Sequence, residues 1–130
     1  MDTEIPIKYR KIHKYNYELT ETYKTTTQIS GKIKTPYITM YGKTLWIKKG
    51  YAWDGATLFP DVESIMTAAL IHDCIYQLIR AGKLNLTFRN DADTILRESC
   101  IKNGMNRASA WGVFFGVRLF GWLSVKSRAA

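Results

Sequence analysis

The strongest constraint on the fold is a change in hydrophobic periodicity near Asp61. Before it, apolar residues alternate with Thr, Lys and other polar residues in short runs, which is typical of half-buried strands. After it, residues 62–81 form a continuous helix-compatible stretch with no internal Pro or Gly. We therefore predict an α+β fold, in which a small N-terminal antiparallel β-sheet is followed by three α-helices.

Turn residues suggest how the first half is divided. Residues 33–47 are expected to form a hairpin with its bend at Gly42, within one sheet of three to five short strands. Lysines alternate with the apolar positions of these strands. They are Lys32, Lys34, Lys43, Lys48 and Lys49. Two interpretations stay open: a surface for nucleic acid or lipid, or the solvated face of a half-buried sheet.

Cap residues mark the helices of the second half. Gly82 suits a left-handed cap at the end of the first helix. Asn90 is expected to cap a second helix that stops at residues 103–104. Asn106 is expected to cap a third helix, which carries the apolar run 108–125.

Length and composition limit the class of protein. A chain of 130 residues, 46% of them hydrophobic, is predicted to be a single domain, 1–130, with a β-rich part (1–50) and a helical part (62–125). Two cysteines cannot build a disulfide scaffold or a Cys-x-x-Cys zinc site. No basic segment followed by an apolar stretch begins the chain, so we expect no secretory signal and synthesis in the cytoplasm.

The charge distribution is uneven. The formal net charge is +8, which favours an anionic partner. Seven of the eleven acidic residues nevertheless lie in residues 51–104, whereas residues 105–130 contain four basic and no acidic side chains. The acidic middle segment either places carboxylates for chemistry or a cation, or reflects the preference of helix N-termini for acids.

A histidine and an acid lie in the middle of the first predicted helix. His72 and Tyr76 are four residues apart and share a face, and Asp73 lies about 100° round the helix. A partly desolvated His beside a carboxylate can act as a general base near neutral pH. The alternative is a buried His whose hydrogen bonds only support the fold.

A second acidic cluster begins the next helix. Two antiparallel helices joined by a short linker face each other, so Asp91 or Asp93 can meet His72 and orient its ring. We predict that the partner is Asp93. Arg89 can pair with Asp93 one helical turn on, as a plain ion pair.

Two further features complete the candidate site. Asp54, in a Trp-Asp-Gly loop ahead of the His-Asp helix, is expected to lie near Asp73 if that loop belongs to the site. Arg118 interrupts the apolar run of the third helix, which argues against a membrane span. We expect Arg118 to be buried and paired with an acid of residues 54–93. A surface that contacts a membrane interface stays an alternative interpretation of the apolar run.

Four motifs in order resemble a family of uncharacterised domains found mostly in tailed bacteriophages and prophages. They are Trp53-Asp54-Gly55-Ala56, His72-Asp73-x-x-Tyr76, Arg89-x-x-Ala92-Asp93 and Val117-Arg118-Leu119-Phe120-Gly121. The resemblance spans residues 50–121 and implies a phage protein made in the host cytoplasm, with a place in the virion open.

The His-Asp helix is also similar to the active-site helix of secreted phospholipases A2. That similarity implies His72 as general base, Asp93 as the carboxylate that orients it, and Tyr76 as support. It implies Asp73 as the calcium ligand. Asp54, in the preceding loop, is the second metal ligand that we predict. Ala69 stands where that family usually has cysteine, and its disulfide set and most of its calcium-loop glycines are absent.

Two functions remain in competition. The first is a calcium-dependent hydrolase of bacterial membrane lipid or another ester. The second is a non-catalytic virion, tail-associated or host-interaction protein, partnered by other phage proteins, whose His72, Asp73, Asp93 and Arg118 form a structural network. Nucleic acid is the less favoured partner. The sequence lacks the residues that define a zinc metalloprotease, a phosphate-binding glycine loop and a Gly-x-Ser-x-Gly hydrolase, so these classes are excluded.

Overall fold

The computed structural model describes residues 7–12, 17–53 and 63–129. The described strands come before the described helices, so the predicted α+β fold is confirmed. The chain divides into two compact units, residues 5–55 with the strands and residues 56–130 with the helices.

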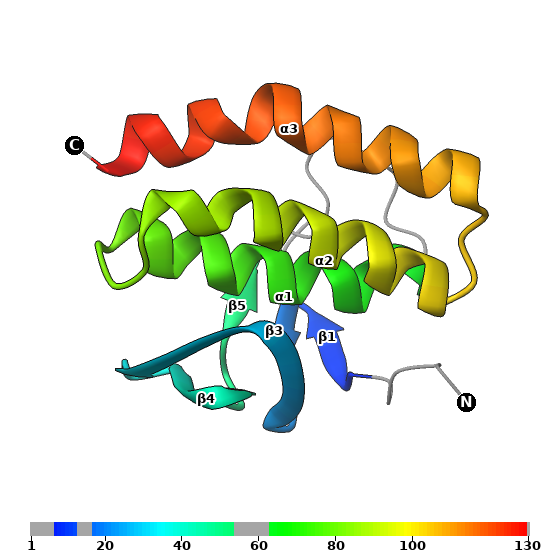
Figure 1. Ribbon diagram of the computed structural model, residues 1–130. Coiled ribbons are helices and arrows are strands. Elements are labelled where there is room, and N and C mark those ends of the chain that lie inside the picture. The colour runs from blue at the N-terminus through cyan, green and yellow to red at the C-terminus, as the bar shows by residue number, and fades with distance from the viewer. Residues whose placement is uncertain (1–6, 13–16, 54–62, 130) are drawn as a thin grey trace. The chain divides into compact units, whose positions relative to one another are not determined.

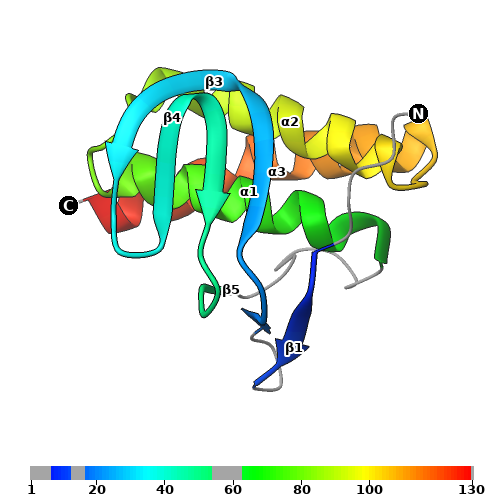
Figure 2. The same ribbon diagram turned by 90° about the horizontal axis from the view of Figure 1, so that it is seen from below.

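The described strands form two small antiparallel sheets, whereas one sheet is the expectation from the sequence. β2 (Tyr17–Leu19) lies between β1 (Tyr9–Lys11) and β5 (Ala52–Trp53) in the first sheet. β3 (Tyr23–Lys34) and β4 (Ile38–Ile47) form the second, a long curved hairpin that is clearest in Figure 2. The expected hairpin 33–47 overlaps the second sheet but pairs other residues, whereas β1 and β5 are too short to leave an alternating pattern.

The expected bend at Gly42 is wrong, because the hairpin turns at residues 35–37. Thr35 closes this turn: its backbone N–H donates to the carbonyl of Ile38 at 2.8 Å, and its Oγ1 accepts from the Ile38 N–H at 2.9 Å. Gly42 lies within β4, opposite Gly31, at a shift in strand register. Its φ of +61° is a left-handed conformation that one common kind of bulge uses and that a non-glycine residue rarely adopts.

The helical unit is a bundle of three helices. α1 (Glu63–Arg80), α2 (Arg89–Lys102) and α3 (Arg107–Ala129) are joined by short links, so that α2 runs antiparallel to both neighbours (Figure 1). Small and aliphatic side chains from all three helices form its core. They are Ile65, Ala68, Leu96, Cys100, Ala110, Val113 and Val117. None of the described helices is both long enough and apolar enough to cross a membrane.

Two of the three predicted helix caps are confirmed. Gly82 has a φ of +74°, and the N–H of Lys83 donates to the carbonyl of Leu78 at 2.8 Å, which closes a left-handed C-terminal cap. At the start of α3, the side-chain oxygen of Asn106 accepts from the N–H of Ser109 at 2.8 Å.

The expected cap at Asn90 is wrong. Asn85 accepts from the N–H of Thr87 at 2.9 Å and opens a short 3₁₀ turn, Leu86–Phe88, which leads directly into α2 at Arg89. Asn90 therefore lies inside the helix. Because the helical path starts before residue 90, Arg89 and Asp93 stand one turn apart on the same side of α2.

Candidate functional site

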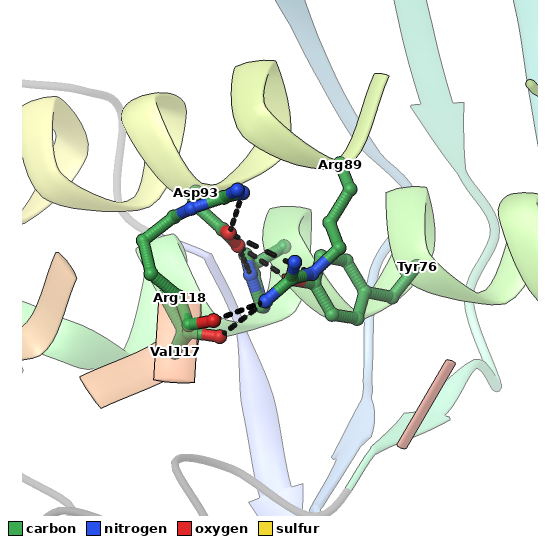
Figure 3. Close-up of polar contacts among 6 residues, drawn as sticks. Tyr76, Arg89, Asp93, Val117 and Arg118 are labelled. Atoms are coloured by element: carbon green, nitrogen blue, oxygen red, sulfur yellow. Dashed lines mark hydrogen bonds and ion pairs between the residues drawn. The ribbon is translucent and has the colours of Figure 1, made fainter. Parts of the chain in front are cut away.

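The centre of the candidate site is Asp93, whose side chain is fully buried in the first part of α2. Its Oδ1 atom accepts two hydrogen bonds from α1, from His72 Nε2 at 2.7 Å and from the Tyr76 hydroxyl at 2.6 Å. Figure 3 shows the carboxylate between the side chains of α1 and α3. A buried carboxylate needs such donors, because it has lost its hydration.

The predicted contact between His72 and Asp93 across two antiparallel helices is confirmed. His72 and Tyr76 lie one turn apart on α1, and their ring centroids are 4.1 Å apart. This spacing lets both rings reach the same oxygen. Asp91, the other acid considered, is exposed in the first turn of α2, as expected of an acid at a helix N-terminus.

Arg118 binds the second oxygen of Asp93. Its Nη1 atom lies 2.9 Å from Asp93 Oδ2, so the predicted pairing with an acid of the middle segment is confirmed. The expected full burial is wrong, because the Arg118 side chain keeps 33% of its surface exposed. Residue 118 lies on the flank of α3 between the buried Val117 and the exposed Leu119, so the helix cannot bury it completely.

Arg89 connects the cluster to the backbone of α3. Its Nε donates to the Tyr76 hydroxyl at 3.1 Å, and its Nη2 donates to the carbonyls of Val117 at 2.9 Å and Arg118 at 2.6 Å. The ion pair expected with Asp93 is long, with 4.0 Å between Nε and Oδ2. Sequence reasoning missed the two carbonyl acceptors, because no side-chain pattern marks a backbone group that a neighbouring helix presents.

The electrostatics of the cluster favour an ionised Asp93. Burial by itself raises the pKa of this carboxyl, but hydrogen bonds from His72, Tyr76 and Arg118 outweigh burial and hold the pKa below its usual range. The pKa of Tyr76 is raised strongly, first by burial and then by its hydrogen bond to Asp93. Tyr76 is therefore a neutral donor, and Asp93 is an anion.

An ionised Asp93 fixes the chemistry of His72. A carboxylate can only accept, so the hydrogen between the two residues lies on Nε2 and the lone pair of neutral imidazole lies on Nδ1. Among the described residues, no hydrogen-bond partner is found for Nδ1. The His72 side chain keeps 14% of its surface exposed, whereas Asp93 keeps none. Of these two, only His72 is reachable by solvent.

One of the two expected calcium ligands lies outside the described residues. Asp73 follows His72 on α1 and is half-buried, and Asp54 lies outside the described residues. Within the described ranges, no group of three or more His, Cys, Asp or Glu side chains is arranged to hold a metal ion. The closeness of Asp54 and Asp73, and with it calcium binding, stays a prediction.

Comparison with known proteins gives a family. Residues 32–117 match the family model described as "Protein of unknown function (DUF1353)". The match covers more than half of the chain and includes His72, Tyr76, Arg89 and Asp93. No curated protein and no solved structure matches the chain.

Proposed function

Because the chain belongs to the DUF1353 family, whose function is unknown, we propose a function from the cluster itself: hydrolysis of an ester by a water molecule that His72 activates. The observation that carries the proposal is the 2.7 Å contact between His72 Nε2 and a fully buried Asp93. A buried carboxylate that holds one imidazole nitrogen leaves the other nitrogen available as a general base.

The reaction follows from the positions of the protons. His72 Nδ1 takes a proton from water while the water oxygen bonds to the ester carbonyl carbon. The imidazolium that forms is stabilised by the Asp93 carboxylate. When the tetrahedral intermediate collapses, the ester C–O bond breaks and the leaving alkoxide takes the proton from Nδ1. The products are a carboxylic acid and an alcohol, and His72 is again neutral.

The other members of the cluster position this pair. Tyr76 shares Oδ1 with His72, and Arg118 binds Oδ2, so the carboxylate has donors on both sides. Both oxygens are therefore fixed, and the imidazole plane is held with them. Positioning of this kind matters because a general base must lie within hydrogen-bond reach of the proton it removes.

The finer proposal concerns the biological setting. The four motifs that resemble a phage domain family support a phage-encoded protein. The similarity of the His72-Asp73 helix to phospholipases A2 supports bacterial membrane lipid as the substrate. In that setting Asp73 and Asp54 are the proposed calcium ligands. Calcium would supply a positive charge at the ester carbonyl.

The test separates the base from the structural hydrogen bond. His72→Gln keeps a side-chain N–H that can donate to Asp93 but removes the basic nitrogen. His72→Ala removes both. Hydrolysis of a soluble fluorogenic ester and of phospholipid vesicles is measured, with calcium and with a chelator. We expect His72→Gln to retain the fold and lose about 10²-fold or more of the rate. Full activity of His72→Gln would exclude His72 as the base.

One observation favours a second function. The buried guanidinium of Arg89 donates to Tyr76 of α1 and to two backbone carbonyls of α3. Such bonds join three helices without any chemistry. We propose, as the alternative, a non-catalytic virion, tail-associated or host-interaction protein in which the cluster supports the bundle. No hydrolysis of any ester, together with unfolding of His72→Gln, favours this alternative.

A further inference from the structure

One face of α3 is apolar without being part of the core. The inner face contributes Ala110, Val113 and Val117 to the packed interior. On another face, Trp111, Phe115 and Leu119 keep 40%, 61% and 70% of their surfaces exposed. Residues four apart lie above one another on a helix, so these three side chains form one row, called here the α3 apolar row. A helix that is apolar on two faces presents more apolar surface than its bundle uses.

Aromatic rings concentrate at one end of the row. The centroids of Trp111 and Phe115 are 5.7 Å apart, and Phe114 lies within 5.5 Å of both. The guanidinium carbon of Arg97, on α2, lies 4.1 Å from the centroid of the Trp111 ring; this side chain is 16% exposed and pairs with Glu98 at 3.6 Å. Tryptophan is typical of the boundary between lipid headgroups and acyl chains, because its ring has an apolar body and one polar N–H.

Charge distinguishes between the possible occupants of this face. α3 contains four basic residues and no acidic one, and the exposed Arg107 stands one turn before Trp111 in line with the row. α3 has no acidic side chain to pair with Arg107 of a second copy, so a dimer through this face would gain no opposite charge. A surface of anionic phospholipid offers both the apolar boundary and the opposite charge.

We propose that the α3 apolar row docks the protein onto a bilayer that contains anionic phospholipid, with the helix lying along the headgroup boundary. This inference rests on the proposed function in one respect, namely that it identifies the ester as a bilayer phospholipid. Arg118, the residue before Leu119, binds Asp93, so the row lies next to the candidate site along α3. Docking brings that site to the surface where its substrate is.

Binding is measured first with a protein that cannot hydrolyse the lipid. His72→Gln protein is sedimented with vesicles of phosphatidylglycerol and phosphatidylcholine, and with vesicles of phosphatidylcholine alone. In this background Phe115→Gln with Leu119→Gln should lower the partition coefficient on anionic vesicles by about tenfold or more, because two exposed apolar side chains no longer transfer. Arg107→Glu should lower it as well, and added salt should weaken binding of the parent.

The control removes an exposed aromatic ring from the other unit. Tyr41, on β4, is 64% exposed, and Tyr41→Gln should leave vesicle binding unchanged. Binding that the double variant leaves unaltered, or that Tyr41→Gln reduces equally, overturns the proposal. So does a dimer, seen by sedimentation without lipid, that the double variant converts to a monomer.

Activity then separates docking from catalysis. With His72 present, the double variant should hydrolyse a soluble short-chain ester at the parent rate and vesicle lipid about tenfold more slowly. If the double variant matches the parent rate on vesicle lipid as well as on the soluble ester, docking is overturned while the hydrolase proposal stands. A parent that hydrolyses neither substrate, yet loses vesicle binding through the double variant, supports docking and refutes the hydrolase.

Discussion

Replacing Asp93 by Asn tests whether its negative charge holds the helical bundle together. The substitution keeps the shape of the side chain and one oxygen, but it removes the anion that Arg89 and Arg118 face at 4.0 Å and 2.9 Å. Asp93 is fully buried and Arg89 nearly so. Water therefore cannot solvate the Arg89 guanidinium in place of the anion that the substitution removes.

The expected loss follows from this burial. Removing one partner of a buried ion pair costs about 3–5 kcal/mol. The lower end applies here, because Arg118 is one third exposed and recovers part of its hydration. A chain of 130 residues loses about 4 °C of melting temperature per kcal/mol. We therefore expect Asp93→Asn to melt about 12 °C below the parent at pH 7.

The difference should depend on pH in a defined direction. The pKa of Asp93 is lower in the folded protein than in the unfolded chain, so the unfolded state binds more protons in the acid range. The stability that the carboxylate contributes is thus fully present above about pH 4 and is lost as the pH falls through the folded-state value. The gap between parent and Asp93→Asn should shrink below about pH 4.

The assay is thermal unfolding followed by circular dichroism from neutral to acid pH, with Asp91→Asn as the matched control. Asp91 is on the same helix but exposed, and its loss should change stability by less than about 1 kcal/mol. If Asp93→Asn melts within about 2 °C of Asp91→Asn at pH 7, or if the gap widens in acid, the charge argument is wrong.

Other substitutions test single contacts by thermal or urea unfolding. Arg118→Leu makes α3 more apolar and yet should lose about 1–3 kcal/mol, because Oδ2 of Asp93 loses its donor; a more stable variant would contradict this. Tyr76→Phe should lose about 1–2 kcal/mol, because two hydrogen bonds of the hydroxyl disappear; no change would show that they are weak. Gly82→Ala should lose about 1 kcal/mol, because φ is +74° there; a gain would mean that the cap rearranges. Millimolar calcium should raise the melting temperature if Asp73 and Asp54 bind it; no shift removes the metal from the hypothesis.

The sequence predicted contacts that depend on one helix pair better than contacts that depend on the whole bundle. The meeting of His72 and Asp93 followed from helical spacing and a short linker. The pairing of Arg118 with an acid followed from the cost of an unpaired guanidinium. The bonds from Arg89 to carbonyls of α3 had no such signal, because they depend on how α3 packs against α2.

Local turn chemistry explains the errors in the element boundaries. Asn85 and Asn90 are both suitable caps, and only the 3₁₀ turn after Asn85 decides between them. Gly42 suits either a hairpin bend or a bulge, and its positive φ is used in the bulge. The two residues of β5 form a strand because β2 is available to pair with them, which no local pattern indicates.

The bonds from Arg89 to the carbonyls of Val117 and Arg118 also determine where α3 stands along its own axis. Ridges of apolar side chains repeat every turn, so a helix moved by one turn, about 5.4 Å, can find nearly equivalent packing against its neighbours. Such a slip would separate Arg89 from both carbonyls and Arg118 from Asp93 in one step. Arg89 therefore fixes the axial position of α3, and any sliding of α3 along its axis changes the contacts of the carboxylate beside His72.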